Sequence, residues 1–311
     1  MPLFLPYEDD IPNVALYGGR HGYELIEKFI PQAVLHMSGQ MLLLFSSLTK
    51  KDKVDEILEK HLLDFELLEE QSFFFEKLLV YRVVKSRLRE ELEAKKISEI
   101  KYLARGHRGI VFTGKFKGKK VAIKTKRGSS TADTMQNEVD MLQRVNKDSI
   151  GPKYLFSAKD YVVYEFVEGK PLGEDDISKK VAIEVMGQCR KLDNMHVTKE
   201  EMMRPHKHII IGKKVVLIDF ERARIHLKPQ NVTQFSEFLR RHGYKVAELA
   251  QQYKNTYSEA DFAKIMHEIR SGKPQLKLRD RYVEKLKKIH KKGKFISFNS
   301  IHEFKKSIKH A

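Results

Sequence analysis

Apolar residues recur with two different periods along this chain, and the change of period predicts where helices and strands alternate. Between residues 134 and 145 the apolar positions have helical spacing, with Glu138 at the edge of the stripe. A second helical stripe follows Ser178, a residue type that often caps the start of a helix. Residues 161–164 and 215–218 are instead continuous apolar runs, which are typical of buried strands.

The first hundred residues show their own alternation of helices and strands. A helix is predicted at residues 23–30 and a strand at 41–45. A second helix is predicted from the spacing of Val54, Ile57, Leu58 and Leu62. Residues 65–68 and 73–84 then predict a pair of strands.

The balance of charge divides the chain at about the same place. Residues 1–100 carry 18 acidic and 13 basic side chains, a net charge of −5, whereas residues 101–311 carry a net charge of +22. Such an asymmetry indicates a domain boundary, and the polar, helix-prone segment 87–96 lies close to it. We therefore predict a partial α/β segment at 1–86, a linker at 87–98 and a second domain at 99–311.

Composition limits the classes of function. A chain of 311 residues with 41% apolar side chains can form two cores, yet no apolar run is long enough to span a membrane. No pattern of a signal peptide is visible, and the single cysteine, Cys189, excludes an internal disulfide. We therefore expect no membrane association and a cytoplasmic protein in a reducing compartment.

The first motif with chemical meaning is a glycine-rich stretch followed by a lysine. Gly106 and Gly109 allow the backbone to approach phosphate oxygens, and Val111 fits an apolar position over an adenine. Lys124 follows in Val-Ala-Ile-Lys. Together these residues resemble the glycine-rich loop and third strand of the protein kinase superfamily. The resemblance implies an α+β, two-lobed domain that binds ATP, with an N-lobe at about 99–168 and a C-lobe at about 169–311.

Three further positions continue the kinase pattern in the expected order. Glu138, on the next predicted helix, is the candidate partner of Lys124. The strand that leads into Glu165 and Val167 resembles the hinge whose backbone binds adenine. Asp219, at the end of the buried strand, resembles the magnesium-binding aspartate, and an oxygen ligand suits a hard cation. The resemblance thus implies ATP and Mg²⁺ as cofactors.

The predicted catalytic loop departs from the kinase pattern. Met203 occupies the position of the usual aspartate and cannot accept a proton, and His208 occupies that of the usual asparagine. Three nearby groups could replace the base, namely Glu200, Glu201 and His206, of which His206 is the first choice. His208 could instead ligate or orient the metal ion. The alternative is a solvated loop without a catalytic role.

The segment from Arg204 to Ile211, with the Ile-Asp-Phe-Glu-Arg-Ala sequence after it, resembles a group of archaeal serine/threonine kinases related to RIO-like kinases. The function implied is phosphotransfer from ATP-Mg to a serine or threonine of a protein substrate. Two alternatives stay open at this point. One is an ATP-binding pseudokinase that acts as a scaffold, or else an ATPase, working with an RNA or methyltransferase partner. The other is an RNA-binding module associated with a methyltransferase.

The predicted partners come from the two ends of the chain. Residues 15–24 resemble the stretch after the substrate-binding motif of HemK-like glutamine methyltransferases, although Met1 to Phe4 keep only one proline of that motif. The natural chain could begin upstream, another subunit could complete the sheet, or the segment could dock on the kinase-like domain. At the other end, the basic run 285–292 predicts either a solvated helix face or a contact with the phosphate backbone of RNA or DNA.

Overall fold

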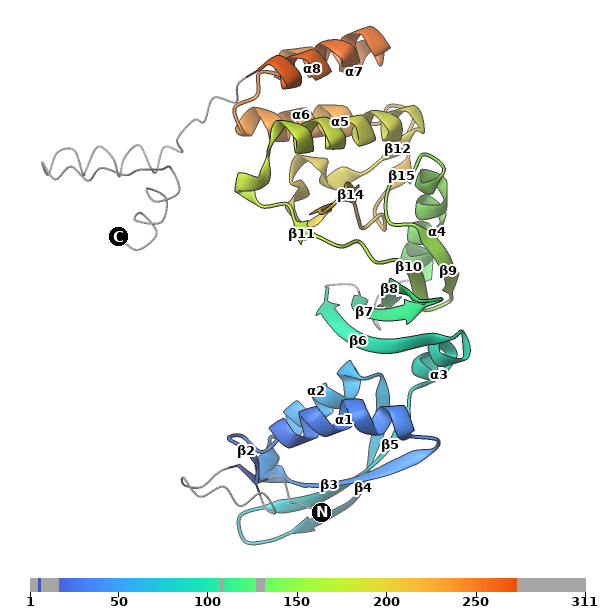
Figure 1. The fold of residues 1–311 in the computed structure, drawn as a ribbon, viewed down its shortest axis with the longest axis vertical. Coiled ribbons are helices and arrows are strands. Elements are labelled where there is room, and N and C mark those ends of the chain that lie inside the picture. Colours follow the sequence, from blue (N-terminus) through green and yellow to red (C-terminus); the bar gives the residue numbers. More distant parts are fainter. Residues whose placement is uncertain (1–4, 7–16, 107–108, 127–131, 273–311) are drawn as a thin grey trace, which may run out of the picture.

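The computed structural model describes residues 5–6, 17–106, 109–126 and 132–272, which form three parts along the long axis of the molecule (Figure 1). An N-terminal α/β unit is followed by a lobe built on a five-stranded sheet and then by a mainly helical lobe. The protein is therefore α+β, and its second domain has two lobes, as predicted. Residues 1–4 and the basic run 285–292 lie outside the described residues.

The N-terminal unit packs two helices on one face of a three-stranded antiparallel sheet. Strand β5 lies in the middle and pairs with β3 and β4 on its two sides. The buried side chains Ile26, Leu43 and Tyr81 illustrate how helix and sheet share one core. The elements are β1 (Leu5–Pro6), β2 (Tyr17–Gly19), α1 (Glu24–His36), β3 (Gln40–Ser46), η1 (Ser47–Thr49), α2 (Lys51–Lys60), β4 (Leu63–Ser72) and β5 (Lys77–Lys85).

Several predicted boundaries in this unit were wrong. Helix α2 ends at Lys60, before Leu62, and β4 extends over Leu63–Ser72 instead of residues 65–68. Helix α1 continues through Pro31 to His36, because its buried stripe of Ile26, Ile30 and Val34 extends across the proline. Strand β5 begins at Lys77 instead of residue 73, and the three phenylalanines before it lie exposed in the β4–β5 turn. Packing of the helix face thus outweighs the cost of one lost backbone hydrogen bond.

The segment predicted as a linker forms helix α3 (Arg87–Ala94), which contacts the parts on both sides of it. Leu92 is fully buried in the core of the five-stranded sheet. The Arg89 guanidinium donates to the His61 carbonyl in the N-terminal unit at 2.8 Å and to Glu93 at 2.8 Å. The helix is therefore an ordered connection between the N-terminal unit and the N-lobe.

The N-lobe is an antiparallel sheet with strand order β6-β7-β8-β10-β9 and one helix beside it. Lys124 on β8 pairs across the sheet with Val111 on β7 and Val162 on β10, so these side chains share one face. The elements are β6 (Ile97–Arg105), β7 (Gly109–Phe116), β8 (Lys119–Lys126), α4 (Ala132–Asn146), β9 (Tyr154–Ala158) and β10 (Tyr161–Glu165).

Up to residue 272, where the described part of the chain ends, the C-lobe consists of four long helices and several short strands. Ser178 caps α5 by accepting a hydrogen bond from the Val181 amide, as the sequence predicts. Cys189 on α5 has no exposed surface and belongs to the core of this lobe. The elements are β11 (Lys170–Pro171), η2 (Glu174–Asp176), α5 (Lys179–Asn194), β12 (Val197–Thr198), η3 (Glu200–Met203), η4 (Pro205–Lys207), β13 (Ile209–Ile211), β14 (Val215–Leu217), β15 (Arg224–Ile225), α6 (Asn231–Arg241), α7 (Ala247–Thr256) and α8 (Glu259–Ser271).

The short strands fix the loops that carry the candidate chemistry. Strand β13 pairs with both β11 and β14, and β12 pairs with β15. These pairings place the segments 199–208 and 218–223 between the N-lobe and the helices of the C-lobe (Figure 1). Within the described part of the chain, no helix combines the length and apolar character needed to cross a membrane.

Candidate active site

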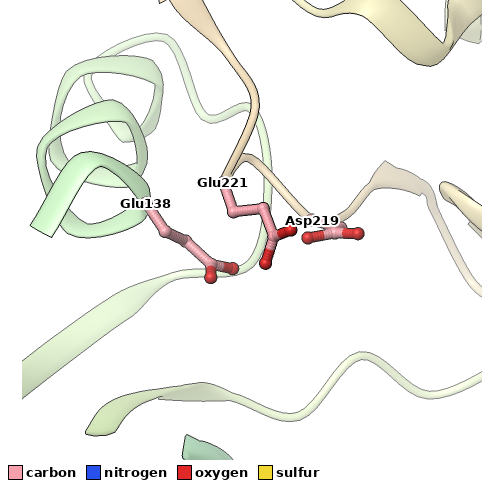
Figure 2. A group of neighbouring side chains, drawn as sticks. All are labelled: Glu138, Asp219 and Glu221. Atoms are coloured by element: carbon pink, nitrogen blue, oxygen red, sulfur yellow. The ribbon is translucent and has the colours of Figure 1, made fainter. Parts of the chain in front are cut away.

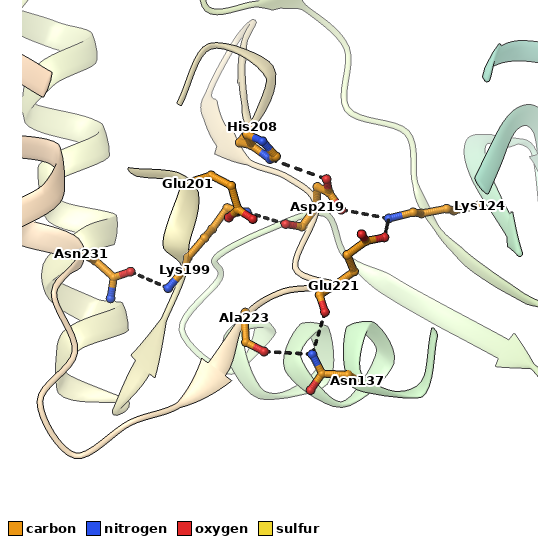
Figure 3. A network of polar contacts seen from close by, with 9 residues as sticks. All are labelled: Lys124, Asn137, Lys199, Glu201, His208, Asp219, Glu221, Ala223 and Asn231. Carbon is orange, nitrogen blue, oxygen red and sulfur yellow. Dashed lines mark hydrogen bonds and ion pairs between the residues drawn. The ribbon is translucent and has the colours of Figure 1, made fainter. Parts of the chain in front are cut away.

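Lys124 lies at the centre of the candidate site, between the two lobes of the second domain. Its Nζ is 2.8 Å from the carboxylate of Glu138 on α4. The same nitrogen is 2.9 Å from Asp219 Oδ1 and 3.1 Å from Glu221 Oε2, both in the segment after β14 (Figure 3). The predicted contact of Lys124 with Glu138 is therefore present, and the same lysine also binds the C-lobe.

The carboxylates outnumber the cation at this point. Burial alone would lower the pKa of Lys124, but the charges of Glu138 and Asp219 outweigh it and raise that pKa well above the usual lysine range. Burial raises the pKa of Glu138 despite the nearby lysine, and the charges of Asp219 and Glu221 add to the rise. The charged form of Lys124 is therefore favoured, whereas burial favours the neutral form of Glu138.

Asp219 is presented by a tight turn at the end of β14. Its φ of 64° lies in the left-handed region, which is uncommon for residues other than glycine. On the other side of the turn, the Asn137 amide of α4 donates to the carbonyls of Glu221 at 2.8 Å and Ala223 at 2.9 Å. Burial would raise the pKa of Asp219, but Lys124 outweighs it and lowers that pKa, so the side chain is an anion.

Lys199 is a site residue that the sequence analysis missed. Its side chain has no exposed surface, and its Nζ donates to the backbone carbonyl of Asp219 and lies 3.1 Å from the Glu201 carboxylate (Figure 3). Burial lowers the pKa of Lys199, against the opposing charges of Glu201 and Asp219. A lysine next to two glutamates is typical of an exposed polar loop, so the local sequence gives no sign that this side chain is buried.

The three candidate bases occupy different environments. The ring of His206 lies against Phe238, with centroids 5.3 Å apart, and its Nδ1 lies 3.1 Å from the carbonyl oxygen of Leu172. Glu200 pairs with Arg224 at the surface. Glu201 is only 13% exposed and is joined to Asp219 through the shared lysine. Of the three, Glu201 is therefore the side chain connected to the Asp219 turn.

His208 lies beside Asp219, with its Nδ1 3.6 Å from Asp219 Oδ2. That distance exceeds a hydrogen bond, and this buried nitrogen has no hydrogen-bond partner among the described residues. Burial, reinforced by the charge of Lys199, lowers the pKa of His208 and favours the neutral ring. A neutral imidazole at this position could orient a metal ion bound by Asp219, which is one of the roles predicted for His208 from the sequence.

The glycine-rich loop connects β6 to β7, and residues 107 and 108 lie outside the described residues. The Gly106 amide donates to the Gly109 carbonyl at 2.8 Å, which closes the loop. Gly109 is required by space, because a Cβ there would lie 2.4 Å from the Thr125 carbonyl oxygen. Val111, one strand from Lys124, is half-buried on the face that carries the lysine.

The predicted hinge follows β10. The amide of Glu165 donates to the Lys153 carbonyl at 2.8 Å, and its side chain lies 3.3 Å from Lys119. The next amide, of Phe166, donates to the Lys120 carbonyl. Val167 is half-buried directly after this point. The backbone here is thus held against the N-lobe sheet, and contact of Glu165 or Val167 with adenine stays a prediction.

The carboxylates of Glu138, Asp219 and Glu221 have the chemistry of a site for a hard divalent cation. One oxygen from each lies within 4.8 Å of the others, and the three side chains converge from α4 and the segment after β14 (Figure 2). Oxygen ligands are what Mg²⁺ prefers. Lys124 Nζ contacts all three, so a cation could engage them only if the lysine turned to another anion.

Comparison with known proteins gives a distant structural likeness. No protein-family model matches the sequence, and none of the curated proteins matches it. Among solved structures 719 chains match, one of them in the ternary complex of streptomycin, ATP and APH(2")-IIa. That chain is 11% identical, with 61% of the present chain and 97% of the other covered and a TM-score of 0.36. Function must therefore be inferred from the side chains of the site.

Proposed function

We propose that this protein is an ATP- and magnesium-dependent phosphotransferase whose acceptor is a serine or threonine hydroxyl of a protein. The observation that supports it most is the meeting of Lys124 with Glu138 and Asp219, at 2.8 and 2.9 Å, from both lobes of the domain. Phosphoryl transfer depends mainly on positioning and on neutralising charge. A buried lysine held between two carboxylates, next to a glycine-rich loop, provides both.

Nucleotide binding would use groups that are now engaged with one another. Lys124 would turn from Asp219 and Glu221 to phosphate oxygens, while Glu138 keeps the ammonium oriented. Gly106 and Gly109 would bring backbone N–H groups close to the phosphates. Asp219, with Glu221 beside it, would hold the magnesium ion. The bound ion would neutralise charge on the phosphate oxygens.

Glu201 is the proposed proton acceptor. In the transfer step the acceptor hydroxyl oxygen bonds to the γ-phosphorus, the bond from that phosphorus to the ADP oxygen breaks, and the hydroxyl proton passes to Glu201. Its carboxylate is held by Lys199, which also binds the Asp219 carbonyl. His206, the first choice from sequence, is engaged with Leu172 and Phe238 and is the less favourable candidate.

Thermal unfolding with ATP, with and without magnesium, tests nucleotide binding. A ligand at about a hundred times its dissociation constant stabilises the folded state by roughly 2.7 kcal/mol. We expect such a shift in the parent protein, and none that depends on magnesium in Asp219→Asn. Because Asp219 is 37% exposed, this substitution should leave the fold intact. A parent protein with no shift would refute the proposed function.

Release or transfer of labelled γ-phosphate tests the chemistry. Glu201→Gln should lower turnover by about a hundredfold or more, the range of general-base catalysis, with little change in ATP affinity. His206→Ala should retain turnover once its effect on stability is allowed for. If His206→Ala loses turnover and Glu201→Gln does not, the base is His206 and the phosphotransferase proposal still stands.

A pseudokinase is the second candidate, favoured by one observation. Met203, which stands at the position of the usual aspartate, has an exposed side chain without acid-base chemistry. A nucleotide-binding scaffold would give the magnesium-dependent thermal shift but would transfer no phosphate. Failure to detect phosphate release with Mg²⁺ or Mn²⁺, in a protein that binds ATP, would select this second candidate.

A further inference from the structure

Lys199 is fully buried, with no exposed surface. The ammonium lies 3.1 Å from the Glu201 carboxylate and donates to the Asp219 carbonyl. It also lies 4.9 Å from the centre of the Phe220 ring, a cation–π contact. Its neighbours are therefore the proposed base on one side and the proposed metal-binding turn on the other.

The backbone of Lys199 is anchored in the core of the C-lobe. Its amide donates to Asn231 Oδ1 at 2.8 Å, and the Asn231 side chain donates to Asp193 at 2.7 Å and to the Val197 carbonyl at 2.6 Å. Asp193 in turn accepts a hydrogen bond from Tyr253 on α7 at 3.0 Å. All these groups are buried, so the origin of the lysine side chain is fixed.

The contacts specify what a side chain at this position must do. It must reach from the anchored backbone to two oxygens, carry a positive charge for Glu201 and present its charge to an aromatic face. An ammonium with three donors meets these needs. Burying the charges of Lys199 and Glu201 costs desolvation free energy, so the pair does not by itself indicate a gain in the stability of the fold.

We propose that Lys199 is a positioning residue that fixes Glu201 relative to the Asp219 turn, so that the proton acceptor and the magnesium ligand keep one geometry. This inference rests on the proposed function. The lysine acts through the carboxylate and the carbonyl that it binds. Small errors of position at such a site are expected to cost turnover much more than binding.

A double-mutant cycle with Lys199→Met and Glu201→Gln tests the inference in the full chain. Methionine keeps much of the length and apolar volume but removes the charge and the donors. We expect Lys199→Met to lower phosphate release by about a hundredfold, with the KM for ATP-Mg changed less than about threefold. We expect turnover of the double variant to lie within about threefold of the slower single variant, because both substitutions disable the same pair of contacting residues.

The controls separate positioning from general stability. Lys180→Met changes an exposed lysine on α5 and should leave turnover and melting temperature unchanged. If Lys199→Met fails to fold, the same cycle is run with Lys199→Arg, which keeps the charge but not the geometry, and the same non-additive loss is expected. Full turnover of the Lys199 variant, or losses that multiply in the double variant, would overturn the positioning role while the proposed function stands. A parent protein without magnesium-dependent ATP binding would instead fail the proposed function itself.

Discussion

Replacing Lys124 by methionine should destabilise the protein by an amount that depends on pH. The lysine side chain is 13% exposed and the Glu138 side chain 3% exposed, with 2.8 Å between the charged groups. Methionine preserves much of the volume but leaves Glu138 buried without a cation. Removal of one partner from a buried ion pair costs about 3–5 kcal/mol. For a domain of this size that corresponds to a fall in melting temperature of roughly 6–20 °C.

The pH dependence follows from Glu138. The unfolded carboxyl titrates near 4.5, and burial raises its pKa in the folded protein. Without Lys124 the folded pKa rises further, so the folded variant binds a proton more strongly than the unfolded chain. Stability is therefore retained at low pH and is lost as pH rises through the folded pKa. The difference between parent and variant should be larger at pH 8 than at pH 5.

Urea unfolding at the two pH values, without nucleotide, measures this effect. Lys119→Met, an exposed lysine on the same strand, is the matched control and should change stability little. Adding Glu138→Gln to Lys124→Met should recover about 2 kcal/mol at pH 8, because the uncompensated charge is removed. The reasoning would be refuted by a loss below about 1 kcal/mol at pH 8, or by equal losses at both pH values.

Two further predictions concern the segments around the lysine. Asn137→Ala removes two hydrogen bonds to the carbonyls of Glu221 and Ala223, so we expect a stability loss of about 1–3 kcal/mol and weaker magnesium-dependent ATP binding. Gln136→Ala, at an exposed position of the same helix, is its control, and ATP binding equal in both variants would contradict the role of Asn137. Gly109→Ala should lower the melting temperature by several degrees because its Cβ would lie 2.4 Å from the Thr125 carbonyl oxygen. Gly106→Ala is the control, because its Cβ would lie 3.4 Å from the nearest atom. Equal melting temperatures for the two glycine variants would show that space at Gly109 is not limiting.

Contacts that depend on regular elements could be predicted from the sequence. The resemblance to kinases paired Lys124 with a carboxylate on the next helix, and the helical spacing of apolar residues placed Glu138 there. Asp219 was found because it follows a buried strand in a sequence that resembles the magnesium motif of kinases. The cap of α5 at Ser178 was equally local. In each case a short stretch of sequence carries the information that the fold uses.

The catalytic loop could not be predicted in this way. Positions in segment 199–208 were assigned by counting from the next strand, but the loop is anchored by Asn231 on α6, which binds the Lys199 amide. The orientation of His206 depends likewise on Phe238, also on α6. Such contacts join residues more than thirty positions apart and follow no period. The burial of Lys199 is therefore a tertiary effect.

The carboxylate of Glu221 adds to a negative charge that is in excess at the site. The side chains in contact here are the carboxylates Glu138, Glu201, Asp219 and Glu221 and the ammonium groups of Lys124 and Lys199. With every carboxyl ionised, two negative charges remain without a cation. Burial is the main cause of the raised pKa of Glu138, and the charges of Asp219 and Glu221 add to the rise. A divalent cation would cancel the excess negative charge, and the second lysine would keep Glu201 from adding to the repulsion. Glu221 thus contributes to the two uncompensated negative charges that the proposed magnesium ion would balance.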